Sequence, residues 1–446
     1  MRPRESLGRA VQAAVASRVA GSGAGLTGAD ARELARYLAW TELESRVATG
    51  LGEGEESLSL SEEEAVVEGV MAAMFGLGPA IEALLADPSI EQIDINGHDM
   101  VWVHYADGSK EQVDPVAGSN EELVSLLRAA AARLGLSERP FDAAHPILDL
   151  PLPDGSRLSA AMAITAVPVV SIRRHRLMDV RLSDLVDLGT LTPGLAEFLA
   201  AAVRARANVI LGGPTGAGKT TLLRAAAAEA SARERLVTIE DDRELWLDRL
   251  ADRHPDCVAM ESRPANTEGE GAIGLSDLVR HSLRMAADRV ILGEVRGGEV
   301  TELLRVMSQG RGGSMGTIHA DSSAGVFQRL AMYAAASPER LPAETANLLI
   351  SGAVDFVVYI DLVSRPEGSA RSISGPPWRF PPEPGQRRVV TSVREVTGAE
   401  GPMVISNEIF RPSPGGLAVP GAPVSIAWAS RLAAAGYAGH PIGAGR

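Results

Sequence analysis

The segment GGPTGAGKTT, residues 212–221, has the spacing of a loop that binds phosphate. It fits the pattern G-x-x-x-x-G-K-[S/T] and lies between an apolar run, NVILGG, and a helix-forming run, LLRAAAAEA. Glycines let the backbone curl until its N–H groups face a phosphate, and the helix N-terminus adds a positive dipole end. The pattern therefore predicts a site for ATP or GTP, and the residues expected to form it are Gly213, Pro214, Thr215, Gly216, Ala217, Gly218, Lys219, Thr220 and Thr221.

Lys219 stands out because the chain has 43 basic residues and only two of them, Lys110 and Lys219, are lysines. A slim ammonium group fits inside a backbone cradle, whereas the planar fork of arginine does not. We therefore expect Lys219 to contact the β- and γ-phosphates of a nucleotide. Thr220 follows it and is expected to offer its hydroxyl to Mg²⁺.

Acidic residues and a histidine follow three other predicted strands. RVILGEVRGGE ends an apolar run at Glu294, from which a carboxylate can reach Mg²⁺-bound water or polarise the attacking water. Gly293 precedes it where an aspartate is usual, so a metal role falls to Glu294 or to another residue. SMGTIHADS ends a strand at His319, which is either a sensor of the γ-phosphate or a structural histidine. VTIEDDRELWL supplies a cluster that is either catalytic or a solvated acidic loop: Glu240, Asp241, Asp242 and Glu244.

The elements that must hold these residues alternate in type. Short apolar runs alternate with helical segments over residues 207–362, which predicts an α/β fold with a mainly parallel sheet covered on both faces. We expect a helical region at 1–75, an α+β domain at 76–180, a linker and helix at 181–206, a P-loop ATPase domain at 207–362, a flexible loop at 363–387, and a C-terminal hairpin and tail at 388–446.

Composition restricts the partners and the compartment. The net charge of −14 disfavours broad contact with nucleic acid, because an acidic surface repels phosphate backbones. Cys257 is the one cysteine, so a disulfide framework is excluded and a reducing compartment is expected. The longest nearly apolar run, residues 159–172, is too short to span a bilayer. These features predict a cytoplasmic protein.

The motifs occur together in an order that identifies a family. GPTGAGKTT, TIEDDRELWL, RVILGEVRGGE and GTIHADSSAGVFQRL resemble the corresponding boxes of the type II/IV secretion-system traffic ATPases. The likeness runs from about residue 75 to about residue 410 and is strongest to the Flp-type (tight-adherence) pilus assembly branch. The resemblance implies a homohexameric ring in which each subunit binds ATP between an N-terminal domain and a P-loop domain.

The resemblance also implies roles for single residues. TIEDDRE matches the acidic box of the family, so Glu240 and Glu244 become catalytic candidates. ILGEVRG and TIHA match the second nucleotide motif and the histidine box, which gives the same status to Glu294 and His319. DGSR and SIRR resemble strands that send arginines to the γ-phosphate, and these arginines are Arg157 and Arg173.

The function implied by the resemblance is a cytoplasmic ATPase, associated peripherally with the inner face of the cell membrane. It would power pilus assembly or secretion through an inner-membrane platform protein, and a conjugation-type secretion ATPase is a close alternative. A nucleic-acid translocase or helicase has the same core, but the net charge and the lack of a lysine/aromatic stripe argue against it. A scaffold that binds ATP without hydrolysing it is disfavoured by Lys219, Thr220 and Glu294.

Overall fold

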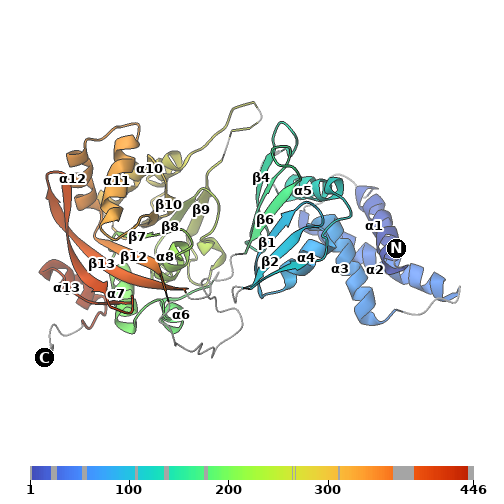
Figure 1. Cartoon of the computed structure of the whole chain (residues 1–446), viewed down its shortest axis with the longest axis horizontal. Coiled ribbons are helices and arrows are strands. Elements are labelled where there is room, and N and C mark those ends of the chain that lie inside the picture. The colour runs from blue at the N-terminus through green and yellow to red at the C-terminus, as the bar shows by residue number, and fades with distance from the viewer. Residues whose placement is uncertain are drawn as a thin grey trace. The chain divides into compact units, whose positions relative to one another are not determined.

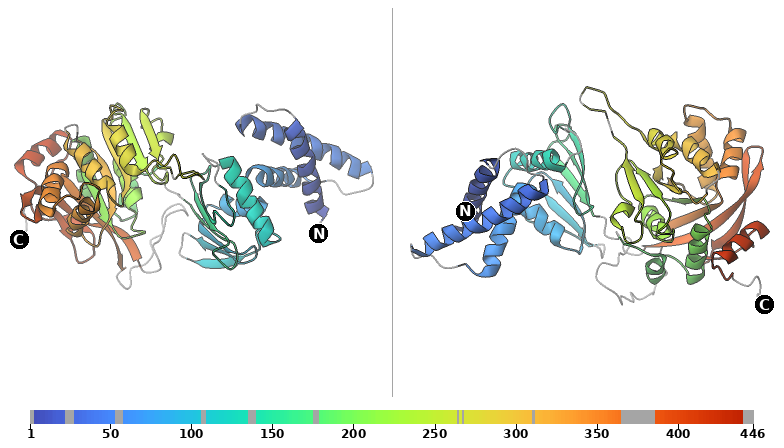
Figure 2. Two further views of the ribbon diagram at one scale, coloured as in Figure 1. Left: turned by 90° about the horizontal axis from the view of Figure 1, so that it is seen from above. Right: turned by 180° about the vertical axis from the view of Figure 1, so that it is seen from behind.

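The structure is a computed structural model, and it divides into two compact units, Met1–Arg174 and His175–Arg446. The elements of both units are labelled in Figure 1 and seen from two more directions in Figure 2. The structure describes residues 3–21, 28–52, 58–105, 109–134, 140–174, 179–263, 265–266, 268–309, 312–364 and 386–439. The loop expected at 363–387 therefore lies mostly outside the described residues.

Three helices open the first unit: α1 (Pro3–Gly21), α2 (Gly28–Gly52) and α3 (Leu60–Phe75). They pack around a small apolar core that includes Val11, Leu43 and Met71. The shorter helix α4 (Pro79–Ala86) follows. No single helix among the described residues is long and apolar enough to cross a membrane, although α3 and α4 pass by length and composition as a pair bent by 107°.

A six-stranded antiparallel sheet forms the rest of the first unit, in the order β3-β2-β1-β6-β5-β4. Alternate residues such as Ile93, Leu158 and Ile172 are buried on one face and pack with the buried side of α5, while the residues between them form a polar face. The elements are β1 (Ile90–Asn96), β2 (Val101–Tyr105), β3 (Lys110–Val113), α5 (Asn120–Leu134), β4 (Ile147–Pro151), β5 (Arg157–Ala161) and β6 (Val169–Arg173).

The second unit contains a nine-stranded sheet in the order β15-β14-β13-β12-β7-β11-β10-β8-β9. The strands from β12 to β9 in this order pair in parallel, and the remaining edge is antiparallel. Its strands are β7 (Val209–Gly213), β8 (Leu236–Glu240), β9 (Cys257–Glu261), β10 (Arg289–Val295), β11 (Met315–His319), β12 (Phe356–Ser364), β13 (Gln386–Glu400), β14 (Met403–Pro412) and β15 (Ala418–Pro420). The predicted α/β fold with a mainly parallel sheet is confirmed.

Helices cover both faces of this sheet (Figure 1). Val209 and Leu211 point into one apolar core and Ile210 points into the other, which explains why the strands are nearly continuous apolar runs. One core includes residues of α6 (Leu182–Asp187), α7 (Pro193–Arg204), α8 (Lys219–Ala227) and α13 (Ile426–Ala434). The other includes residues of α9 (Leu275–Ser282), α10 (Glu299–Ser308), α11 (Gly325–Ala336) and α12 (Ala343–Ala353).

Candidate active site

The loop between β7 and α8 has the backbone form that phosphate binding requires. Gly216 and Gly218 have φ angles of 76° and 93°, a region that residues with a side chain rarely adopt. The amide of Ala217 donates to the carbonyl of Pro214 at 3.3 Å, which closes a turn within the loop. Lys219 is the first residue of α8, so the positive end of the helix dipole faces this turn.

The Lys219 side chain folds back into the loop and is almost fully buried. Its Nζ donates to the carbonyl oxygens of Gly213 at 3.1 Å and Pro214 at 3.0 Å, and lies 3.1 Å from Nδ1 of His319. Burial lowers the pKa of Lys219, while the nearby Glu294 opposes that shift. The two carbonyls and the imidazole nitrogen thus hold the ammonium at the loop.

His319 connects the loop to Glu294. It ends β11, which pairs in parallel with β7 on one side and β10 on the other, so the three motifs meet at the carboxyl edge of the sheet. Nε2 of His319 lies 2.5 Å from Oε1 of Glu294. Burial and the Lys219 ammonium both lower the pKa of His319. A neutral ring that accepts from Lys219 at Nδ1 and donates to Glu294 at Nε2 satisfies both neighbours.

Arg296 holds the second oxygen of Glu294. Its Nη2 and Nε lie 2.5 and 2.6 Å from Oε2 of Glu294, and its Nη1 lies 3.5 Å from Oδ2 of Asp241. The Glu294 carboxylate is therefore fixed on both oxygens, and Asp241 of the acidic segment is drawn to the same place. Arg296 stands only two residues after Glu294 in the sequence, yet the sequence analysis did not identify it.

Glu240 is the most buried of the predicted acidic residues, with 3% of its surface exposed. Its Oε1 accepts the backbone N–H groups of Glu244 at 3.0 Å and Leu245 at 2.9 Å. Burial raises the pKa of Glu240 to about 8, although these two hydrogen bonds oppose the shift. The side chain is thus an internal brace for the turn that carries Glu244.

The same brace accounts for Gly293. A Cβ atom at this position would lie 2.8 Å from Cγ of Glu240, closer than real Cβ contacts come. The Glu240 side chain therefore occupies the space that an aspartate would need immediately before Glu294. Arg224 of α8 supports the turn from the other side by donating from Nε to the carbonyl of Leu245 at 3.0 Å.

The groups around Thr220 suit a hydrated Mg²⁺ ion. Thr220 donates from Oγ1 to Oε2 of Glu244 at 3.3 Å, which places a hydroxyl and a carboxylate together beside the loop. Within the described residues, no group of three or more His, Cys, Asp or Glu side chains is arranged to hold a metal ion. Mg²⁺ typically binds to one or two protein oxygens together with substrate phosphates and water, so this sparse donor set fits it.

The two predicted arginines belong to the first unit. Arg157 begins β5, Arg173 ends β6, and the two residues are direct partners in the antiparallel pairing. Both lie on the polar face of the sheet, because Leu158 and Ile172 beside them are buried on the other face. The pairing thus puts two guanidinium-bearing residues side by side, in a different unit from the phosphate loop.

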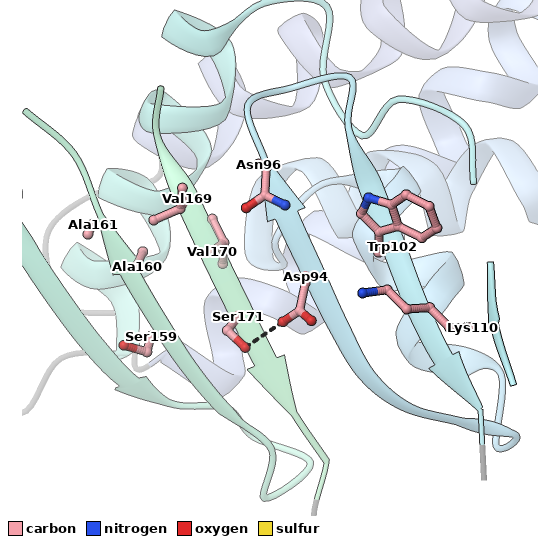
Figure 3. A pocket seen from close by; sticks show the side chains of 10 residues that line it. All are labelled: Asp94, Asn96, Trp102, Lys110, Ser159, Ala160, Ala161, Val169, Val170 and Ser171. Atoms are coloured by element: carbon pink, nitrogen blue, oxygen red, sulfur yellow. Dashed lines mark hydrogen bonds between the residues drawn. The ribbon is translucent and has the colours of Figure 1, made fainter. Parts of the chain in front are cut away.

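The same polar face contains a hollow of 370 Å³, shown in Figure 3. Ser171 and Asp94 both line it and are direct strand partners: Ser171 donates to Asp94 at 2.7 Å, and Asp94 also accepts from Gln92 and contacts His104. Nζ of Lys110 lies 5.0 Å from the ring centroid of Trp102. The second of the two lysines therefore contacts an aromatic ring at a sheet surface.

The parallel sheet, its phosphate loop and the acidic groups at the same edge define this chain as a P-loop nucleoside triphosphatase. The family model for the type II/IV secretion system protein matches residues 77–383, well over half of the chain. The chain belongs to that family.

Individual relatives agree with this family. A putative conjugal transfer protein of Mycobacterium tuberculosis is 36% identical over 259 residues, which cover 56% of this chain and 71% of that protein. The type IV secretion system protein VirB11 of Brucella suis is 30% identical over 330 residues, or 67% of this chain and 88% of the relative. The structure of the ATPase DotB of Legionella pneumophila matches with a TM-score of 0.51 at 18% identity, covering 71% of this chain and 79% of that one, and shows the fold.

Proposed function

We propose that this chain is the ATP-hydrolysing motor of a pilus assembly or type II/IV secretion system. It would act as a homohexameric ring at the cytoplasmic face of the inner membrane and pass the motion driven by Mg-ATP hydrolysis to a platform protein there. The motif set favours the Flp-type (tight-adherence) pilus branch. Support for the broader class comes from relatives named as conjugal transfer and type IV secretion proteins.

The observation that carries the proposal is the convergence of separate motifs on Lys219. His319 and Glu294, which come from two other motifs, form one chain of contacts with it of 3.1 and 2.5 Å. In the proposed mechanism, the loop amides and Lys219 bind the β- and γ-phosphates, and Glu294 polarises the attacking water. His319 contacts both Lys219 and Glu294 and so fixes the ammonium and the carboxylate relative to each other.

The remaining candidates receive supporting roles. Thr220 and Glu244 would hold Mg²⁺, with Glu294 reaching it through water, and the ion would neutralise charge on the phosphates. Glu240 would act as a positioning residue, because it braces the turn of Glu244 from inside the protein. Arg157 and Arg173 would supply guanidinium charge to the γ-phosphate in the transition state and so link hydrolysis to domain movement.

Two alternatives remain distinguishable from the leading proposal. A conjugation-type secretion ATPase would have the same site and differ in its membrane partner. A nucleic-acid translocase would need a basic track, against which the net charge of −14 argues. Filter binding with single-stranded DNA across a salt series separates this second alternative, and we expect no retention at physiological salt.

The proposal is tested by following assembly and hydrolysis together. Sedimentation of the purified chain with Mg-ATP should give a species of six subunits, and phosphate release per subunit should rise with the fraction of that species. If the chain stayed monomeric with Mg-ATP and still hydrolysed it, at a rate per subunit that did not depend on assembly, the proposed ring would be contradicted. Capture from native membranes, comparing wild type with Lys219→Ala, would then identify the platform partner.

A further inference from the structure

Arg388 lies beyond the residues that the family model matches and contacts the phosphate loop. It is the third residue of β13, where it pairs with Leu362 of β12. β12 in turn pairs with β7, with Tyr359 opposite Gly212. The first residues of β13 are thus held beside the point where β7 turns into the loop.

Two contacts join Arg388 to the loop. Its Nε donates to the carbonyl oxygen of Gly216 at 2.9 Å. Its Cδ lies 3.3 Å from the position that a Cβ atom on Gly218 would take. The side chain therefore donates to one glycine of the loop and packs closely over the next.

The hydrogen bond to the Gly216 carbonyl fixes the orientation of the whole Gly216–Ala217 peptide unit. A peptide unit is planar and trans, so the Gly216 carbonyl and the Ala217 N–H point in opposite directions. With the carbonyl turned to Arg388, the N–H is turned to the carbonyl of Pro214, to which it donates at 3.3 Å. That same Pro214 carbonyl accepts from Nζ of Lys219 at 3.0 Å.

We propose that Arg388 is a positioning residue for nucleotide binding, which fixes the turn of the phosphate loop and, through the Pro214 carbonyl, the Lys219 ammonium. The C-terminal hairpin thereby takes part in the nucleotide site although it contains none of the family motifs. The inference deepens the proposed function and rests on ATP binding at this loop.

The test uses Arg388→Met, which keeps an unbranched stem over Gly218 and removes the donor to Gly216. Arg387→Met is the matched control, because Arg387 is the adjacent residue, loses the same charge, and contacts the carbonyl of Gly415 instead. Calorimetric titration of the full chain with Mg-ADP should show about a tenfold loss of affinity for Arg388→Met, the size expected for one charge-assisted hydrogen bond. Arg387→Met should bind as wild type does.

A second measurement separates positioning from general damage. Arg388→Met should raise the KM for Mg-ATP about tenfold and change kcat by less than about twofold, because saturating nucleotide restores the loop. Its thermal unfolding should match that of Arg387→Met. Equal Mg-ADP affinities for the two variants would overturn the inference alone, whereas a wild-type chain that does not bind Mg-ADP would overturn the proposed nucleotide site itself.

Discussion

The sheets of the two units differ in where their polar side chains lie. The sheet of the first unit is antiparallel, buries one face and leaves the other polar, so its chemistry lies on a surface. The sheet of the second unit is mainly parallel and buried on both faces, so its polar groups gather where strands end. Lys110 lies on the polar surface of the first sheet and Lys219 at the strand ends of the second.

Under the proposed function, this difference corresponds to two tasks in one chain. Lys219, Glu294 and His319 are fixed by neighbouring strand ends and by one another, which suits a reaction that needs defined geometry. Arg157 and Arg173 are direct strand partners on the polar face of the first sheet, and the proposed function gives them a role at the γ-phosphate. We therefore expect substitutions at the phosphate loop of the second unit to reduce phosphate release most. Substitutions of the paired arginines in the first unit should reduce phosphate release without reducing Mg-ADP affinity.

The two lysines give the largest expected contrast. Lys219→Ala removes the ammonium from the loop, and steady-state phosphate release should fall to background. Lys110→Ala removes the same charge from the first unit and should leave release within about twofold of wild type. Comparable losses for both variants would show that the loop is not the site of reaction.

The paired arginines come next in size. Arg157→Ala and Arg173→Ala should each lower phosphate release by roughly 10³, the scale of an arginine that stabilises a phosphoryl transition state. Mg-ADP affinity should persist because ADP has no γ-phosphate. Arg36→Ala, at an exposed arginine paired with Glu68, is the control of equal charge. If both variants hydrolysed ATP at the wild-type rate, Arg157 and Arg173 would have no role in hydrolysis.

The two faces of β5 provide a smaller test. Leu158 is fully buried, so Leu158→Ala should lower the free energy of unfolding by about 2–5 kcal/mol through lost packing. Ser159 is the next residue and is exposed, so Ser159→Ala should change it by no more than about 0.5 kcal/mol. Urea titration of the full chain measures both. Similar values would mean that the polar face is covered as well.

The effect expected for Glu240 depends on pH. Its folded-state pKa of about 8 lies above that of an unfolded glutamate, so the folded protein keeps a proton that the unfolded chain releases. The contribution of Glu240 to stability is therefore complete at acidic pH and declines by up to about 1.4 kcal/mol per pH unit as pH rises toward 8.

Glu240→Gln keeps the acceptor oxygen for Glu244 and Leu245 and removes the titration. The free energy of unfolding of the variant should therefore fall less than that of wild type between pH 5 and pH 8. Denaturant titrations at pH 5, 6, 7 and 8 provide the measurement. Parallel curves for the two proteins would show that Glu240 is ionised in the folded state.

Local patterns in the sequence were enough to predict the parallel part of the sheet in the second unit. The apolar runs of β7, β8, β10 and β11 and the glycine spacing of the loop are short-range signals, and they imply that the strand ends meet at one edge. The convergence of Glu294 and His319 follows from that rule. The direct contact between them depends on the register of β10 against β11, which the sequence does not specify.

Residues whose roles depend on distant contacts could not be predicted. The sequence left the run of Glu240 as either catalytic or a solvated acidic loop, and its burial against Gly293 is seen only in the structure. Arg388 is 172 residues from Gly216 and lies in a strand with no known motif. The sequence predicted little about the tail. The tail contains α13, and the ring centroid of its Trp428 lies 4.8 Å from that of Phe356 in the core.

The central claim is that the phosphate loop and Glu294 form one centre for ATP hydrolysis, and Glu294→Gln tests it most directly. The glutamine keeps the size of the side chain and removes its charge. We predict that Mg-ADP affinity stays within about threefold of wild type while phosphate release falls by at least about a hundredfold. Phosphate release at the wild-type rate in this variant would contradict the claim.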